Sequence, residues 1–195
     1  AYDISAEFRV IWNDQGQEDV VLHSLHCDLI VIGHPKSHGI PENWTPDRLL
    51  RATGVPVLIV PDGKDAAGIG DKVLVAWNAS REARRAITDA MPFIETAKTV
   101  TVLVIDADKG AHHYGEEPGA DIALHLARHG AHVEVEQVSS HGKPIGEVIL
   151  SYAAKCEADV IVIGARSHAR PTEILFGGVT RTLLAQSTIP LVMSR

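Results

Sequence analysis

The chain has 195 residues, of which 45% are hydrophobic and 22% charged, and its formal net charge is −7 at pH 7. These values are typical of a soluble globular protein with one large domain or two small ones. The negative charge argues against a general nucleic-acid-binding protein, because there is no surplus of cations to neutralise phosphates. No apolar run approaches the roughly 18–20 residues that span a bilayer, and the first residues lack the regions of a signal peptide, so we expect no membrane association.

The two cysteines, Cys27 and Cys156, lie far apart and form no CxxC pair. Each precedes an apolar strand-like run, where a free thiol usually behaves as a small buried hydrophobic residue. This usage of cysteine predicts a reducing compartment, and we expect a cytoplasmic protein.

The first 62 residues predict a short series of strands and helices. "AEFRVIW" (6–12) predicts a strand, "EDVVLHSLH" (18–26) a helix and "CDLIVIG" (27–33) a second strand, followed by a helix-like stretch and the strand "GVPVLIV" (54–60). The glycines and aspartates of 63–71 then predict a linker.

Residues 72–195 predict a complete second domain of alternating strands and helices. Strands are expected at 72–77, 99–105, 132–138, 159–164 and 190–193, and the last helix is expected to end near Gln186. Ser80 is a suitable N-cap for the first helix, and the alternating pattern of 132–138 predicts an edge strand. This order predicts an α/β fold, with an open parallel five-stranded sheet and helices on both of its faces.

Two segments of the chain are similar to each other. "CDLIVIGHPKSHG" (27–39) resembles "ADVIVIGARSHAR" (158–170), at a separation that indicates a tandem duplication of a domain. Residues 1–62 match only the second half of such a domain. Since a sheet without its first two strands has an open edge, we expect that an N-terminal part is missing; the alternatives are strands that were not placed and a second chain that completes the sheet.

Four segments, taken in order, resemble the universal stress protein family, specifically its tandem two-domain members. They are "KVLVAWNAS", "GKPIGEVIL", "ADVIVIGARSH" and "GGVTRTLLAQSTIPLVM", and the resemblance covers 71–195 and more weakly 1–60. It implies a Rossmann-like sheet of the adenine nucleotide alpha hydrolase type, with strand order 3-2-1-4-5. It also implies a stress-responsive regulatory protein with an unidentified protein partner. Contact through fifth strands would form either a homodimer or a pseudo-dimer within one chain.

The resemblance further implies a site for ATP or a related adenine nucleotide, with Mg²⁺ bound to it. In an open α/β sheet such a ligand lies where the strand order reverses, here between the ends of strands 72–77 and 159–164. The family's phosphate loop keeps its spacing in this sequence, but Ser167 replaces a glycine, Gly178 replaces a hydroxyl residue, and Asn78 stands where the family has an aspartate. The predicted ligand-binding residues are Ala76, Asn78, Val104, Ile163, Gly164, Ser167, Gly177, Gly178, Val179 and Thr180.

The sequence offers little for catalysis or for a metal site of its own. It contains no nucleophile elbow, Walker A motif or HExxH motif, and His125 and His129 alone are too few ligands for a metal. We therefore expect a binding protein and not an enzyme; a member that acts only through protein contacts and a weak ATPase remain as alternatives. The N-terminal copy has Pro35 after Gly33 and no closing glycine pair. We expect it to be structural, with its last strand paired against the second domain.

Overall fold

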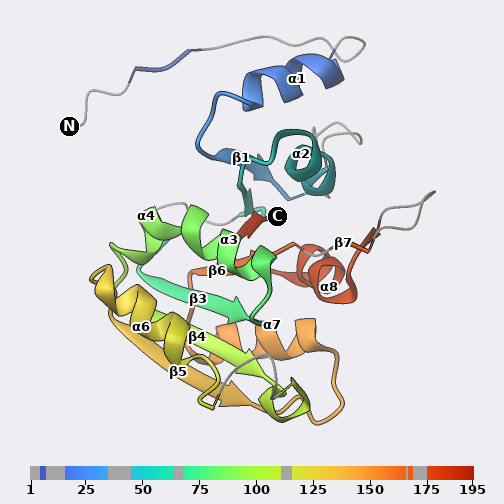
Figure 1. The fold of residues 1–195 in the computed structure, drawn as a ribbon. Coiled ribbons are helices and arrows are strands. Elements are labelled where there is room, and N and C mark those ends of the chain that lie inside the picture. The colour runs from blue at the N-terminus through green and yellow to red at the C-terminus, as the bar shows by residue number, and fades with distance from the viewer. Residues whose placement is uncertain are drawn as a thin grey trace.

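A computed structural model describes residues 5–7, 16–34, 45–63, 68–110, 116–165, 167–168 and 175–195. Its main feature is one seven-stranded sheet in the order β1-β2-β9-β6-β3-β4-β5, with a separate two-stranded hairpin, β7-β8 (Figure 1). The prediction of a five-stranded sheet is therefore wrong, because two strands from the first 60 residues, β1 and β2, continue the sheet beyond β9. Neighbouring strands of the large sheet are parallel except β2 and β9, which are antiparallel.

The C-terminal unit has the predicted alternation of strands and helices. Five of its strands are consecutive in the large sheet, in the order β5-β4-β3-β6-β9, and β5 lies at an edge of that sheet as the alternating sequence predicts. Its strands are β3 (Lys72–Trp77), β4 (Thr99–Ile105), β5 (Val133–Val138), β6 (Val160–Gly164), β7 (Ser167–His168), β8 (Leu175–Phe176) and β9 (Leu191–Ser194). Its helices are α3 (Arg81–Asp89), α4 (Met91–Ile94), the 3-10 helix η1 (Ala107–Gly110), α6 (Ala120–Arg128), α7 (Ile145–Lys155) and α8 (Gly178–Gln186).

The N-terminal unit contributes two helices and two strands. They are α1 (Gly16–Ser24), β1 (Ile30–Gly33), α2 (Pro46–Thr53) and β2 (Val57–Val60). β1 runs parallel to β2, and β2 joins the C-terminal unit by pairing with β9. Most of the strand predicted at 6–12 lies outside the described residues.

Two apolar layers enclose the sheet, because side chains alternate between its two faces. On one face α3 and α6 cover a core that includes Val75, Val102 and Val162. On the other face α2, α7 and α8 cover a second core that includes Leu74, Leu103 and Ile163. Each face of the central strands is therefore buried, which explains their nearly continuous apolar sequences.

Two smaller expectations have different outcomes. Ser80 caps α3 as predicted, since its hydroxyl accepts a hydrogen bond of 3.1 Å from the N–H of Ala83. The cysteines are less buried than expected: Cys27 is exposed and Cys156 is half-buried. Among the described residues, none of the helices combines the length and the hydropathy needed to cross a bilayer.

Candidate functional site

A cavity of about 360 Å³ opens at the carboxyl ends of β3 and β6. β4 and β5 continue the sheet on the side of β3, and β9 continues it on the side of β6, so the strand order reverses between these two strands. Small-molecule sites of open α/β sheets occur at such a reversal, and their volumes are typically about 300–1,000 Å³. The described residues that line the cavity are Ala76, Trp77, Asn78, Leu103, Ile105, Ile145, Ile149, Ile163, Gly164, Gly177, Gly178, Val179 and Thr180.

The inner wall of the cavity is aliphatic. It consists of strand residues such as Ala76, Leu103 and Ile163 together with Ile149 of α7, and these residues extend the core that lies under α7 and α8. Ile149 and Ile163 are only 2% and 3% exposed, so this wall belongs to the packed interior. A wall of this kind suits a flat apolar group, which gains free energy when its surface leaves water.

The opposite wall is the N-terminus of α8, where backbone N–H groups are available. The first helical hydrogen bond runs from the N–H of Arg181 to the carbonyl of Gly177, at 3.1 Å, so Gly178, Val179 and Thr180 have no acceptor within the helix. Gly177, the N-cap, makes no side-chain capping hydrogen bond. A helix end with N–H groups of this kind and a favourable dipole can bind an anionic group.

Asn78 lies at the rim of the cavity, directly after β3, and its orientation is set by Ser80. The backbone N–H and the hydroxyl of Ser80 donate to Oδ1 of Asn78, at 3.3 and 2.7 Å. Since Oδ1 is an acceptor in both hydrogen bonds, the Nδ2 amino group is the half of the side chain that remains for a ligand. Asn78 therefore offers a ligand a hydrogen-bond donor.

Two glycines allow the close contacts that hold the walls in place. A Cβ added at Gly164 would lie 2.3 Å from the backbone N of Ala83, so α3 begins directly against the end of β6. A Cβ added at Gly146 would lie 2.6 Å from Cβ of Thr182, so α7 and α8 are in similarly close contact. Neither glycine has a positive φ, so both are required for space and not for backbone conformation.

The cavity gathers most of the residues predicted from the sequence. Those that line it are Ala76, Asn78, Ile163, Gly164, Gly177, Gly178, Val179 and Thr180. Ser167 lies in the β7–β8 hairpin, paired with Phe176, and its side chain is outside the part of the chain that the structure describes. Arg166 and Arg170, the basic residues on either side of Ser167 and His168 in the sequence, lie outside the described residues.

The prediction that Val104 binds the ligand must be corrected, because Val104 lies on the face of the sheet opposite to the cavity. It is fully buried in the core under α3 and α6, whereas its neighbours Leu103 and Ile105 line the cavity. Side chains alternate along a strand, so an error of one residue moves the choice to the opposite face. Alternation places Leu103 and Ile105 on one face together, but the uniformly apolar sequence of β4 does not show which face meets the cavity. Ile145 and Ile149 share one face of the predicted helix that follows Pro144, which was their signal.

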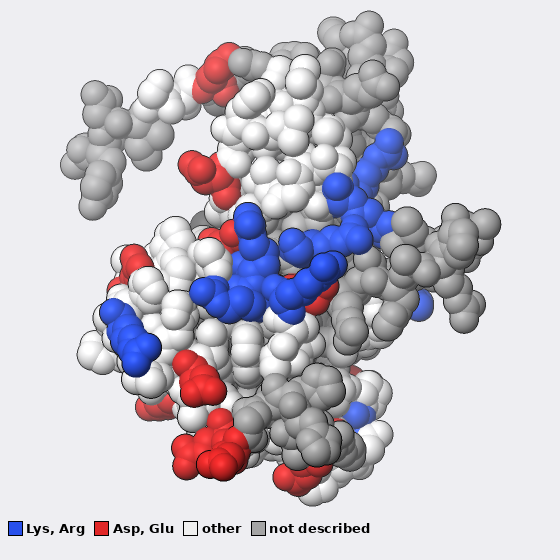
Figure 2. All heavy atoms as spheres, viewed as in Figure 1, with Lys and Arg blue, Asp and Glu red and all other residues white. Residues whose placement is uncertain are grey.

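Charged groups lie mainly outside the cavity. Figure 2 shows Lys and Arg gathered around α3, whereas Asp and Glu are scattered over the same face and are most frequent toward its lower end. Arg81 and Arg85 of α3 pair with Glu82 and Asp89, at 2.9 and 2.8 Å, so this basic region is partly neutralised. None of the described residues that line the cavity has an ionisable side chain.

His125 of α6 and His129, the C-cap of that helix, contact each other at the surface. The rings of His125 and His129 meet edge to face, with centroids 4.9 Å apart. Burial, and then the charge of nearby Arg84, lower the pKa of His125. Within the described ranges no group of three or more His, Cys, Asp or Glu side chains is arranged to hold a metal ion.

A comparison with protein families and solved structures adds independent information. The model of the universal stress protein family matches residues 70–195. A universal stress protein from Archaeoglobus fulgidus DSM 4304 has a TM-score of 0.68 at 19% identity, covering 91% of this chain and 66% of its own. The functionally unknown protein PA1789 from Pseudomonas aeruginosa PAO1 has a TM-score of 0.56 at 21% identity, with the same coverage of 91% and 66%.

A shorter relative matches a smaller part of the chain. A universal stress protein from Archaeoglobus fulgidus has a TM-score of 0.53 at 20% identity, covering 64% of this chain and 97% of its own. No curated protein sequence is significantly similar to the chain. The chain thus spans 66% of the length of the longer relatives, and at these identities the structural likeness shows the fold alone.

Proposed function

Because this chain belongs to the universal stress protein family, we propose that its C-terminal unit, residues 72–195, binds ATP or a related adenine nucleotide and that the protein is a stress-responsive regulatory module. One observation carries this proposal. A single cavity combines an aliphatic wall with the N-terminal N–H groups of α8, at the point where the strand order reverses. An adenine nucleotide has the matching chemistry, with an apolar base at one end and an anionic phosphate chain at the other.

The base and the ribose would occupy the part of the cavity nearest to β3 and β4. Leu103 and Ile105 would contact the base, and Asn78 would donate from Nδ2 to a ribose hydroxyl. A neutral amide makes a weaker hydrogen bond than a carboxylate. Because Asn78 replaces the family's aspartate, we expect the hydrogen bond to the ribose to be weaker but still present.

The phosphates would lie at the N-terminus of α8. A Cβ added at Gly178 would have no atom within 4 Å, so this wall is open enough for a bulky anion. Gly178 lacks the family's hydroxyl but keeps its N–H, and Thr180 lies in the first turn of the helix at the cavity wall. Mg²⁺ would be held largely by the phosphate oxygens, since the described lining contributes no carboxylate.

The lining supports binding more than hydrolysis. A general base needs an ionisable side chain within hydrogen-bond reach of the attacking water, and the described lining residues offer none. We therefore propose that the nucleotide acts as a ligand that changes conformation or association, and that it is not a substrate.

We also propose that the contact between fifth strands is made within one chain. β2 already pairs with β9, through Val57–Met193, Leu58–Val192 and Ile59–Leu191. This pairing occupies the edge of β9, which a second molecule would need for a homodimer of the same kind. It supports the pseudo-dimer over the homodimer.

Two substitutions of Gly178 test the nucleotide site. Gly178→Ser restores the family's hydroxyl and keeps the backbone N–H, so affinity for ATP–Mg²⁺ should stay equal or rise. Gly178→Val places two methyl groups over the N–H groups in open space, so affinity should fall at least about tenfold while the fold is kept. Isothermal titration calorimetry measures both affinities, and circular dichroism checks the fold.

A separate measurement identifies the ligand that the purified protein carries. Native mass spectrometry of the purified protein, and chromatography of any ligand released from it, should reveal an adenine nucleotide. If no such nucleotide is found, and millimolar ATP–Mg²⁺ produces neither heat of binding nor a thermal shift, the binding proposal is wrong. If ATP binds but Gly178→Val leaves its affinity unchanged, the phosphates do not lie at α8.

A further inference from the structure

Thr180 is a buried polar residue in the wall of the cavity. It is 3% exposed, and none of the described residues makes a hydrogen bond with its hydroxyl. Two other helical threonines bond to the carbonyl four residues before them, Thr182 to Gly178 at 3.0 Å and Thr53 to Leu49 at 2.7 Å. Because buried hydroxyls are normally hydrogen-bonded, the unpaired hydroxyl of Thr180 indicates a partner other than the described chain.

The cavity is where this partner would lie. Thr180 lines the cavity and its Oγ1 keeps accessible surface there, whereas Oγ of Ser194 is buried, unpaired and sealed among the described residues. A hydroxyl that is removed from water without a hydrogen bond costs free energy, and an acceptor in the cavity removes this cost. The hydroxyl of Thr180 is therefore placed to bond a ligand.

The position of Thr180 on α8 indicates which part of a ligand it meets. Thr180 lies three residues before Leu183 on the same face of the helix, and Leu183 packs in the core that forms the aliphatic wall. Gly178 is exposed, and an added Cβ there would have no atom within 4 Å. The hydroxyl of Thr180 thus lies on the inner side of the helix end, next to the aliphatic wall, whereas the N–H of Gly178 lies at its open side.

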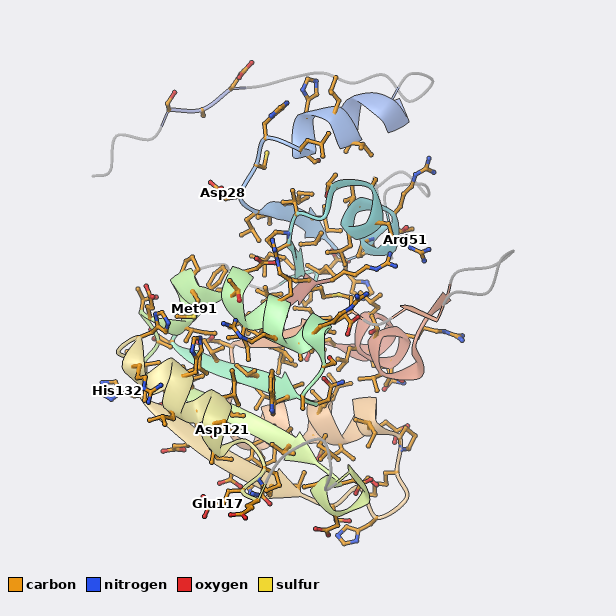
Figure 3. The ribbon with its side chains drawn as sticks, viewed as in Figure 1. Asp28, Arg51, Met91, Glu117, Asp121 and His132 are labelled. Atoms are coloured by element: carbon orange, nitrogen blue, oxygen red, sulfur yellow. The ribbon has the colours of Figure 1, made fainter. Side chains whose placement is uncertain are left out.

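The charges around α8 suit an anion on this inner side. α8 packs on one face of the sheet and α6 on the other, so Asp121 of α6 and Glu117 just before it, labelled in Figure 3, lie away from α8. The described lining of the cavity has no carboxylate that would repel an anion. A threonine hydroxyl donates one hydrogen bond, and an anionic oxygen is its strongest acceptor.

We propose that the Thr180 hydroxyl donates to the phosphate group next to the ribose, in place of the hydroxyl that the family carries at position 178. This inference rests on the proposed nucleotide site. A nucleotide that extends from the aliphatic wall to the start of α8 meets Thr180 with its first phosphate and the N–H of Gly178 with its outer phosphates. Thr180 therefore fixes the phosphate that AMP and ATP share.

Thr180→Val tests the hydroxyl, because valine has the same shape and a similar helix propensity but cannot donate. The affinity for AMP, measured by isothermal titration calorimetry without Mg²⁺, should fall at least about tenfold. Thr180→Ser keeps a hydroxyl and should stay within about threefold of the wild type. Thr101→Val is the matched control, because it makes the same change at a buried position of β4 that is not among the described lining residues, and it should leave the affinity unchanged.

Two further measurements separate a role in binding from a role in folding. Since the hydroxyl has no partner in the described chain, Thr180→Val should have a urea denaturation midpoint equal to or above that of the wild type. The affinity for adenosine should be the same in Thr180→Val and in the wild type, because adenosine lacks the phosphate.

The possible results are distinguishable. The inference is wrong if Thr180→Val binds AMP as tightly as the wild type does, or if its urea midpoint is lower. It is also wrong if the affinity for adenosine falls as much as the affinity for AMP, since the hydroxyl would then meet the base or the ribose. A wild type that binds neither AMP nor ATP would instead overturn the nucleotide site itself, and this inference with it.

Discussion

Gly164→Ala tests how closely α3 approaches the end of β6. The added Cβ would lie 2.3 Å from the backbone N of Ala83, 2.4 Å from the carbonyl carbon of Glu82 and 2.8 Å from Cα of Ala83. All three atoms belong to the backbone of the first helical turn, which cannot rotate away as a side chain can. The helix would have to move, although Gly164 itself has no positive φ that would strain an alanine.

The size of the effect follows from this crowding. Overpacking a well-packed interior costs about 1–3 kcal/mol, and here the contacts are with backbone and lie below 3 Å. We expect a loss of about 3 kcal/mol in the free energy of unfolding. For a chain of this length that corresponds to a decrease in Tm of roughly 6–12 °C.

Urea denaturation followed by circular dichroism measures this loss, with Gly178→Ala as the control. At Gly178 an added Cβ would have no atom within 4 Å, so the control should lie within about 0.5 kcal/mol of the wild type. If Gly164→Ala is as stable as Gly178→Ala, with an unchanged m value, α3 does not press on β6 and the reasoning fails.

Three further predictions concern neighbouring features. Ala79 has a φ of 53°, so Ala79→Val should destabilise the protein by more than about 1 kcal/mol in urea denaturation while Ala79→Gly does not; equal stability of all three proteins would contradict this strain. Asn78→Asp should raise the affinity for ATP a few-fold in calorimetry, since a carboxylate would accept from a ribose hydroxyl, and an unchanged affinity would remove residue 78 from the site. Burial, followed by the charge of Arg84, lowers the pKa of His125, so its contribution to stability is present above its ordinary pKa of 6.5 and is lost as the pH falls below it. His125→Gln should therefore lose part of the acid sensitivity between about pH 7 and 5, and equal pH dependences of unfolding in the two proteins would refute this assignment.

Much of the candidate site could be predicted because its residues follow strands and begin helices. Gly164 ends β6, Asn78 follows β3, and Gly177 and Gly178 begin α8, so their positions in the sequence already place them at one edge of the sheet. Val104 could not be placed in this way. Every residue of β4 from Val100 to Val104 is buried, so its apolar sequence does not show which face each residue occupies.

The hydrogen bonds of Asn78 could not be predicted from the sequence either. Its Oδ1 is occupied by Ser80 only because the turn after β3 brings the two side chains together. The consequence, that Asn78 offers a ligand a donor, therefore depends on local geometry and not on residue type.

By itself the sequence determined the order and type of the elements in residues 72–195 and the family, because these depend on local periodicity and on short motifs. Only the tertiary structure decided that β2 pairs antiparallel with β9 and so joins both units in one seven-stranded sheet. Among the described strands β1 lies at one end of the sheet with Val31 exposed, although its sequence is nearly that of β6, in which Val160 to Ile163 are buried. The physical reason is that pairing and burial depend on which strands meet in space, and two similar strands acquire different environments from different neighbours.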